Sequence, residues 1–303
     1  MGLTMREQEP KRHHTVGQFY LERFTDSTGL LYVLDLNSGK ITTQTPLNTM
    51  VRKHFYKVDA CPSGMDPNWF EKLCGRDVEP RANECIRKLI EDPSSMNPEE
   101  WGFMLYYLQL QRTKVPRQIS SMRASLLTRF DALSTELSPE DRPAANALRE
   151  DLAGENFKFW LQRAVGLTMV KAFSQMDWEI ATAPSGSSFI TTDNPVNLCG
   201  PLGESGVGYA GTNVFFPLSS SKLLLLRNPE FKNGSVTAET ILPEAGFRTQ
   251  MRYFPDIRYT PRRVRATNML MSVAAERFIV ANGPVALEEV REQHNRPSKG
   301  PVE

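Results

Sequence analysis

The sequence predicts an α+β protein in which a central helical block separates short β-strands from the N-terminal and C-terminal parts. Three features support this class. A strand-turn-strand pattern lies at 30–45, helix start signals and helical periodicity run over 67–174, and short strand-like runs separated by Gly, Pro, Ser and Asn follow from 178 onward. We expect the strands of the two ends to pair across the helical insert.

The first third is predicted to hold a short helix and a β-hairpin. Residues 18–24 are rich in aromatic side chains and suit one or two helical turns. The segments 30–36 and 40–45 are predicted strands, and Asn37-Ser38-Gly39 between them is a turn sequence. A third strand is expected at 55–58.

Helices are predicted through the middle of the chain. The strongest start is Asn97, because Pro98 suits the first helical position and Glu100 stands where a capping-box acid reaches back to the N-cap. Gly75 is expected to end an earlier helix, and Pro116 is expected to kink the helix that Asn97 begins. The predicted helices start at Asp66-Pro67, Pro80, Asn97, Ser138-Pro139 and Asn156.

The last third is predicted to be mainly β-structure with one closing helix. That helix is expected over 267–280, with Thr267 as its N-cap. Residues 284–303 are expected to form a flexible tail. The predicted strands lie at 178–182, 188–191, 213–217 and 223–227.

The chain length of 303 residues lies near the size at which one core gives way to two. Residues 1–283 are predicted to form a single α+β domain. The alternative is two intimate subdomains. One would be β-rich and formed by 12–60 with 176–283, and the other would be helical and formed by 66–175.

Composition excludes several classes of partner. The 36 basic and 35 acidic side chains give a net charge of +1, so the overall charge supplies no reason to bind a polyanion or an anionic membrane. The apolar runs are far shorter than the roughly 20 residues of a membrane span, and we expect no membrane partner. The four cysteines lack a C-x-x-C pair, which disfavours structural zinc and predicts reduced thiols in a cytoplasmic protein.

Several motifs resemble one family. The run His14-Thr15-Val16-Gly17-Gln18-Phe19-Tyr20-Leu21-Glu22-Arg23-Phe24 resembles H-Y-V-P-Q-F-Y-L-x-x-F, the opening motif of the domain-of-unknown-function 4238 family. The chain departs at Thr15, where the family usually has an aromatic residue, and at Gly17, where it usually has proline. The resemblance implies one shared architecture over nearly the whole chain, with no established activity. It continues through Phe55-Tyr56, Gln109-x-x-Arg112, Arg117, Ile190-Thr191-Thr192-Asp193-Asn194-Pro195-Val196, Pro217-Leu218-Ser219 and the 268–280 segment.

His14 and Gln18 form the first candidate site. At this spacing an imidazole and an amide can lie on one side of a helical turn, which suits general acid-base chemistry or the binding of a phosphate or base edge. His14 is a candidate catalytic residue and Gln18 a candidate substrate-binding residue. The alternative is that His14 caps the helix while Phe19 and Tyr20 anchor it in the core.

Arg112 is a cation within the apolar stripe of the helix that Asn97 begins. An unpaired buried charge costs several kcal/mol, so Arg112 needs a carboxylate such as Asp193 or Glu71, or a bound anion. Arg117 lies just past the expected kink, and the two arginines would then form a phosphate clamp that binds substrate. The alternative is a structural buried salt bridge.

The run Thr191-Thr192-Asp193-Asn194-Pro195 follows a predicted strand, and binding sites are often built at such strand ends. Asp193 is a candidate catalytic residue that could act as a base, bind a divalent metal as cofactor, or pair with Arg112. Thr192 and Asn194 are candidate substrate-binding residues. The alternative is an Asx-type turn in which these side chains bond their own backbone and Pro195 fixes the bend.

A local basic stretch runs from Arg248 to Arg265, with six arginines against one acid. Tyr253, Phe254 and Tyr259 are interleaved with them, which is the composition of a surface that contacts phosphates and stacks bases. Its candidate substrate-binding residues are Arg262, Arg263 and Arg265. The alternative is a solvated loop balanced by acids elsewhere.

The leading functional hypothesis is an enzyme acting on nucleic acid or a nucleotide, such as a nuclease in a bacterial defence or toxin system. In this hypothesis His14, Arg112 and Asp193 converge, and Asp193 orients His14 or a divalent ion. The competing hypothesis is a non-catalytic nucleic-acid-binding or protein-binding sensor module. Phosphate-binding loops, dinucleotide fingerprints, nucleophile elbows and H-E-x-x-H motifs are absent, which disfavours the enzyme classes that depend on them.

Overall fold

The protein has the α+β class that the sequence predicts. The computed structural model describes residues 12–58, 61, 63–154, 157, 161, 167–200, 206–244 and 246–294. Within these ranges the strands form sheets of four, five and two strands.

The four-stranded sheet joins the two ends of the chain in the order β3-β2-β11-β6, with every neighbouring pair antiparallel. β2 (Leu31–Asp35) and β3 (Lys40–Gln44) form the predicted hairpin, and Gly39 supplies the positive φ of 66° in its turn. β11 (Phe278–Ala281) lies between β2 and β6 (Thr191–Thr192). The expectation that the strands of the two ends pair is confirmed.

The five-stranded sheet comes from the last third, in the order β10-β5-β9-β8-β7. Its pairs are antiparallel except for β10 with β5, which run parallel. The strand expected at 188–191 begins only at Thr191, and that strand belongs to the other sheet. The strands are β5 (Asp177–Thr182), β7 (Asn197–Cys199), β8 (Asn213–Pro217), β9 (Lys222–Arg227) and β10 (Tyr253–Arg258).

The two-stranded sheet pairs β1 (Arg12–His14) with β4 (Val51–Lys53). The strand expected at 55–58 is wrong, because the extended segment ends at Lys53 and the chain then turns. The turn is held by the buried ring of His13, whose Nδ1 accepts a hydrogen bond from the backbone N–H of Tyr56 at 2.9 Å.

The N-terminal motif forms α1 (Gln18–Leu21) and a 3₁₀ turn (Glu22–Phe24), which confirms the predicted one or two helical turns. Two further 3₁₀ turns cover Pro46–Asn48 and Pro93–Ser95. The hydroxyl of Tyr20 donates to the carbonyl of Pro217 at 2.7 Å and lies 2.9 Å from Oγ1 of Thr191. This buried side chain therefore ties the motif to both larger sheets.

α4 (Pro98–Thr113) begins with the predicted capping box, in which Asn97 and Glu100 each accept from the other's backbone N–H. The kink expected at Pro116 is a complete break. Val115 is extended, with φ −84° and ψ 146°, because proline disfavours the helical region for the residue before it. Pro116 instead opens a new helix, α5 (Pro116–Ser134).

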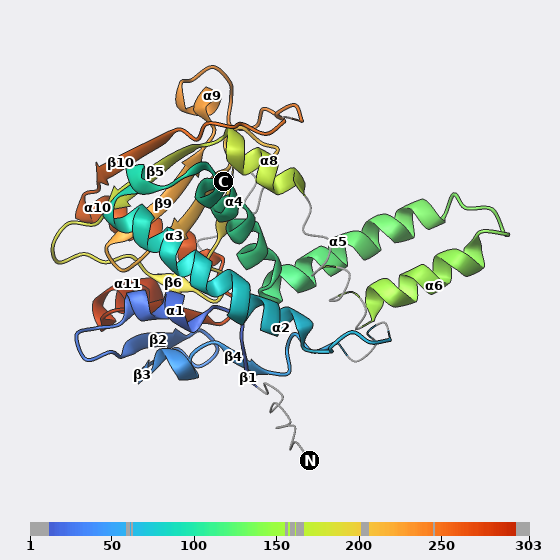
Figure 1. Cartoon of the computed structure of the whole chain (residues 1–303), viewed down its shortest axis with the longest axis horizontal. Coiled ribbons are helices and arrows are strands. Elements are labelled where there is room, and N and C mark those ends of the chain that lie inside the picture. Colours follow the sequence, from blue (N-terminus) through green and yellow to red (C-terminus); the bar gives the residue numbers. More distant parts are fainter. Residues whose placement is uncertain are drawn as a thin grey trace, which may run out of the picture.

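α5 and α6 (Arg142–Ala153) form a hairpin that projects from the body (Figure 1). Its second helix starts after the predicted signal, with Asp141 as N-cap. Residues 156, 158–160 and 162–166 of the helical stretch expected over 156–173 lie outside the described residues, and α8 (Leu167–Gln175) confirms its last part.

The helix expected to end at Gly75 continues through it. α2 (Trp69–Leu73) leads into a π-helical turn (Cys74–Val78) and then α3 (Glu79–Glu91) without interruption. Glycine is tolerated inside a helix at a modest cost, and here it stands in the π-turn.

The end of the chain differs from the prediction. α10 (Pro261–Val273) starts at Thr260, whose hydroxyl accepts from the backbone N–H of Arg263, and it stops before the segment that forms β11. The helix expected over 267–280 is therefore wrong in both limits. The flexible tail expected from 284 is also wrong over α11 (Pro284–His294), where Leu287 and Val290 are buried, while 295–303 lie outside the described residues. The short α9 (Pro229–Lys232) follows β9.

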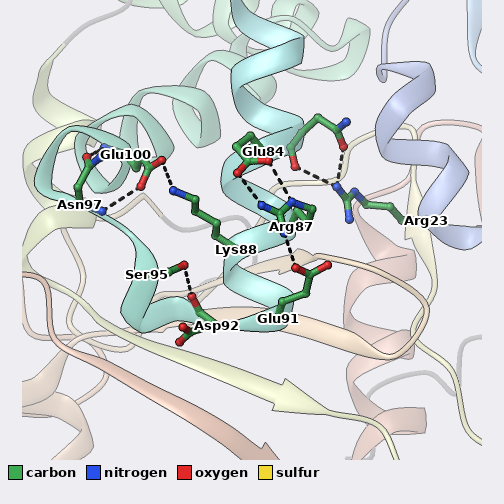
Figure 2. A network of polar contacts seen from close by, with 10 residues as sticks. Arg23, Glu84, Arg87, Lys88, Glu91, Asp92, Ser95, Asn97 and Glu100 are labelled. Carbon is green, nitrogen blue, oxygen red and sulfur yellow. Dashed lines mark hydrogen bonds and ion pairs between the residues drawn. The ribbon is translucent and has the colours of Figure 1, made fainter.

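A polar network fixes α3 against the N-terminal motif and α4 (Figure 2). Arg23 donates to the carbonyl oxygen and Oδ1 of Asn83 at 3.0 and 2.6 Å, and Lys88 lies 2.6 Å from the Glu100 carboxylate. On the outer face of α3, Arg87 pairs with Glu84 and Glu91. α3 is thus held in a fixed position, which matters because α3 carries part of the candidate site.

Candidate functional site

The Thr191–Pro195 motif anchors the loop between α10 and β11. The carboxylate of Asp193 accepts backbone N–H bonds from Glu276 and Arg277, both at 2.8 Å, and from Phe278 at 3.0 Å. Burial raises the pKa of Asp193, and these three N–H groups oppose that shift by stabilising the carboxylate. The contacts favour a structural role for Asp193.

The other polar residues of this motif also bond main-chain groups. Oγ1 of Thr192 donates to the carbonyl of Asn194 at 2.8 Å and accepts from the backbone N–H of Asn194 at 3.1 Å. These bonds form the local turn that the sequence predicts as the alternative to a binding site. The amide of Asn194 donates to the carbonyl of Ala274 at 3.2 Å. The motif thus closes its own turn and holds the C-terminal end of α10, where helix carbonyls lack intrahelical partners.

The two arginines of the expected phosphate clamp donate to different segments. Nη1 of Arg112 lies 3.4 Å from the carbonyl of Val196. Nη1 of Arg117 donates to the carbonyls of Val273 at 2.9 Å and Ala275 at 3.0 Å, the same helix end that Asn194 contacts. A cation at a helix C-terminus is stabilising, so these bonds give Arg117 a structural reason for its position.

His14 and Gln18 do not share a helical turn, because His14 belongs to strand β1 and the helix starts only at Gln18. The amide of Gln18 donates to Glu22 at 2.9 Å on the surface. Nε2 of His14 lies 3.2 Å from the carbonyl of Leu47, and burial lowers the pKa of its half-buried ring. His14, Arg112 and Asp193 contact the main chain at Leu47, Val196 and residues 276–278, respectively.

His14 instead lies near Glu71, Glu79 and Lys114, which no sequence motif indicated as a site, and we call these four residues the polar cluster. The Lys114 side chain is only 4% exposed, and its ammonium lies 3.7 Å from the Glu79 carboxylate. A buried ammonium requires such a counterion. Glu79 raises and Lys114 lowers the pKa of His14, so the ring lies within electrostatic reach of this pair.

Glu71 is the most perturbed carboxyl group of the polar cluster. Burial raises its pKa to about 7, the nearby Glu79 raises it further, and Lys114 and the backbone N–H of His14 oppose the shift. A carboxyl group that titrates near neutral pH can donate or accept a proton under physiological conditions.

The π-helical turn aligns the two glutamates. Eight residues of regular α-helix would rotate Glu79 by about 80° beyond two full turns relative to Glu71. A π-turn holds more residues per turn and so reduces this offset. The thiol of Cys74 lies between them, and burial raises its pKa to about 11, which keeps it protonated. The sequence signal for this pair is two glutamates that flank Gly75, the residue at which the sequence predicts a helix end.

A basic surface adjoins the polar cluster on β1, β4 and the turn after β4, and we call it the basic ribbon. Arg12 pairs with Lys53 in the register of these strands, and both side chains are exposed. Arg52 lies above the ring of Phe55 at 5.5 Å and pairs with Glu276 at 3.0 Å. Figure 1 shows β1 and β4 beside α2, which carries Glu71. The ribbon consists of Arg12, Arg52, Lys53, His54 and Lys57.

The predicted basic stretch from Arg248 to Arg265 is divided by the fold. Arg248 and Arg252 face the buried carboxylate of Asp177 at 3.9 and 3.4 Å. The exposed candidates occupy the first turns of α10, where Arg263 lies 3.9 Å from the centre of the Tyr259 ring. The remaining arginines are Arg258, which pairs with Asp256, and the exposed Arg262 and Arg265. α10 lies across the molecule from α2 (Figure 1).

The described ranges lack two further features, a metal-binding cluster and a membrane-spanning helix. No three His, Cys, Asp or Glu side chains there are grouped so that they could hold a metal ion. None of the helices in that part of the chain has the length and apolar character needed to cross a membrane.

Replacing Asp193 with alanine is expected to destabilise the fold by roughly 3 kcal/mol, because three backbone N–H groups lose their acceptor inside the protein. Asp193→Asn keeps one acceptor oxygen and is expected to lose less. Urea unfolding of both variants measures the two losses, and a loss below about 1 kcal/mol for Asp193→Ala contradicts the anchoring role.

The raised pKa of Glu71 has a consequence for stability. Between its usual 4.5 and about 7 the folded state binds more protons than the unfolded state, so stability falls as pH rises through this window. Glu71→Gln mimics the protonated side chain. The melting temperature of this variant minus that of the wild type should therefore increase as the pH is raised from about 5 to about 8. The matched control is Glu99→Gln, which changes a carboxylate that is 88% exposed. A difference that stays constant with pH contradicts the raised pKa.

Comparison with known proteins agrees with the opening motif. The profile of one family, described as "Protein of unknown function (DUF4238)", matches residues 12–284. No curated protein and no solved structure matches the chain. The matched range includes the motif helix, the polar cluster and all three sheets. The chain therefore belongs to the DUF4238 family.

Proposed function

We propose that the protein is an acid-base enzyme that acts at the polar cluster on a phosphate-bearing substrate, a nucleotide or nucleic acid. The observation that carries this proposal is the contact between the Glu71 carboxyl group and the backbone N–H of His14, within electrostatic reach of the buried Lys114–Glu79 pair. A proton acceptor, a proton donor and a cation are the groups that phosphodiester hydrolysis needs.

His14 is suited to accept a proton. The carbonyl oxygen of Leu47 can only accept a hydrogen bond, so the contact at 3.2 Å places the ring proton on Nε2 and the lone pair on Nδ1. Burial lowers the pKa of the ring and keeps it neutral at physiological pH. A neutral imidazole can take the proton of an attacking water or hydroxyl group.

Glu71 is suited to give a proton. Its pKa of about 7 leaves a large share of the side chain protonated at neutral pH, and the protonated form can supply the leaving oxygen. Because the pKa of His14 is lowered and that of Glu71 is raised, His14 is suited to be the base and Glu71 the acid.

The cations of the site have two roles. Lys114, held at 3.7 Å from Glu79, gives the cluster a fixed positive charge that favours negative charge developing on a substrate. Arg12, Arg52 and Lys53 of the basic ribbon are exposed, so that their side chains can contact phosphates. A nuclease is the specific form of the proposal that these features favour.

One observation favours the competing function, a non-catalytic nucleic-acid-binding or sensor module. Arg117, Asp193 and Asn194, which the sequence singled out for chemistry, all bond main-chain groups around the end of α10. The basic ribbon would then bind a polyanion without turning it over.

The test is cleavage of labelled single-stranded RNA and DNA, and of bis(p-nitrophenyl) phosphate, by the purified full-length chain. We expect turnover that falls as pH rises above about 7, because Glu71 then loses its proton. Glu71→Gln should keep substrate binding and reduce kcat by about 100-fold or more, the usual range for loss of a general acid. Glu99→Gln is the matched control, and it should retain wild-type turnover.

Two outcomes overturn the proposal. Equal turnover by wild type and Glu71→Gln would place the chemistry elsewhere. Salt-dependent binding of oligonucleotides with no cleavage at any pH would identify the binding module, and its dependence on Arg12 and Lys53 would show that the basic ribbon is the surface involved.

A further inference from the structure

A cavity of about 400 Å³ lies apart from the polar cluster, in the range of volumes typical of small-molecule sites. One wall is the face of α8 that carries Lys171, Ala172, Gln175 and Met176. The others come from the start of α9, from Val207 with its neighbour Gly208, from 242–244 and from Arg248. Figure 1 shows α8 and α9 at the opposite end of the body from β1 and β4.

The walls are fixed by hydrogen bonds. The N–H of Leu242 donates to the carbonyl of Gly208 at 2.7 Å, which joins two loops into one wall. The amide of Gln175 donates to the carbonyl of Gly246 at 2.7 Å, and the N–H of Arg248 donates to the hydroxyl of Ser174 at 3.1 Å. The space is therefore preformed, which lowers the entropic cost of binding.

Two cations with loose counterions line this space. Lys171 is 33% exposed, and its partner Glu244 lies 4.0 Å away and is itself 78% exposed. Arg248 is 27% exposed and lies 3.9 Å from Asp177, which Arg252 approaches more closely at 3.4 Å. Nη1 of Arg248 is buried, and the described part of the chain gives it no hydrogen-bond acceptor.

The rest of the lining is largely apolar, with Met176, Val207, Leu242 and Pro243 contributing. Two exposed acids, Glu230 and Glu244, stand at its rim. This rim disfavours a ligand with several negative charges, and the apolar lining favours one with a compact hydrophobic body. A ligand with one carboxylate on an apolar group carries a single negative charge and has a hydrophobic body, so it satisfies both conditions. The planar guanidinium of an arginine also matches the geometry of a carboxylate.

We propose that this cavity binds a small organic acid, with its carboxylate between Arg248 and Lys171 and its apolar body against Met176, Val207 and Leu242. The site is separate from the proposed enzymatic one, so either can exist without the other.

The test is titration of the full-length chain with 2-naphthoate, followed by its fluorescence and by calorimetry. We expect saturable binding that is at least tenfold tighter than that of 2-naphthalenemethanol, which has the same ring and no charge. Lys171→Met leaves Asp177 and its arginines unchanged and should weaken binding of 2-naphthoate at least tenfold, as should Arg248→Met. Arg258→Met removes an arginine that is 86% exposed and lies outside the cavity, and it should bind as the wild type does.

A fourth variant keeps the charges and fills the space. Ala172→Trp should abolish binding of 2-naphthoate, with thermal melts confirming that the variant is folded. The proposal is overturned if 2-naphthoate fails to bind at millimolar concentration, if the uncharged ring binds equally well, or if folded Lys171→Met and Ala172→Trp both bind like the wild type.

Discussion

The polar cluster is organised by one constraint, the burial of the Lys114 ammonium. A charge removed from water needs a nearby counterion, and Glu79 supplies it at 3.7 Å. That pair leaves Glu71, on the same face of the α2-α3 segment, close to both a cation and a second carboxylate. The π-turn between the two glutamates is the local feature that aligns them, and π-turns of this kind are frequent at functional sites. Burial is the main cause of the raised pKa of Glu71, and in this arrangement Lys114 lowers that pKa while Glu79 raises it.

A second constraint is the return of β11 to the N-terminal hairpin. Ile279 pairs with Leu34 of β2 and with Thr192 of β6, so β11 joins the N-terminal hairpin to β6. Asp193 holds the turn that precedes β11 by accepting its backbone N–H groups. The structural hydrogen bonds of the Thr191–Pro195 motif thus account for its hydroxyl, carboxylate and amide groups. The residues proposed for chemistry lie elsewhere, on β1, α2 and the end of α4.

Local signals in the sequence predicted local structure well. The turn at Gly39 and the capping box at Asn97 depend on a few neighbouring residues, and both are confirmed. The prediction of the closing helix was wrong at its C-terminal end. Met271, Ala275 and Phe278 recur at helical spacing, but Phe278 begins the buried strand β11. His14 and the opening motif could be singled out from the sequence. Their partners Glu71, Glu79 and Lys114 could not, because tertiary packing decides which charges are buried together.

The most direct test of the account is the ionisation of Glu71 itself. Carboxyl carbons of a glutamate-labelled sample can be followed by NMR through a pH titration, with Glu71→Gln identifying the resonance. The account predicts a titration midpoint of about 7, and a higher midpoint in Lys114→Met, because the ammonium of Lys114 lowers the pKa of Glu71. A midpoint near the usual 4.5, unchanged by removal of Lys114, would contradict it.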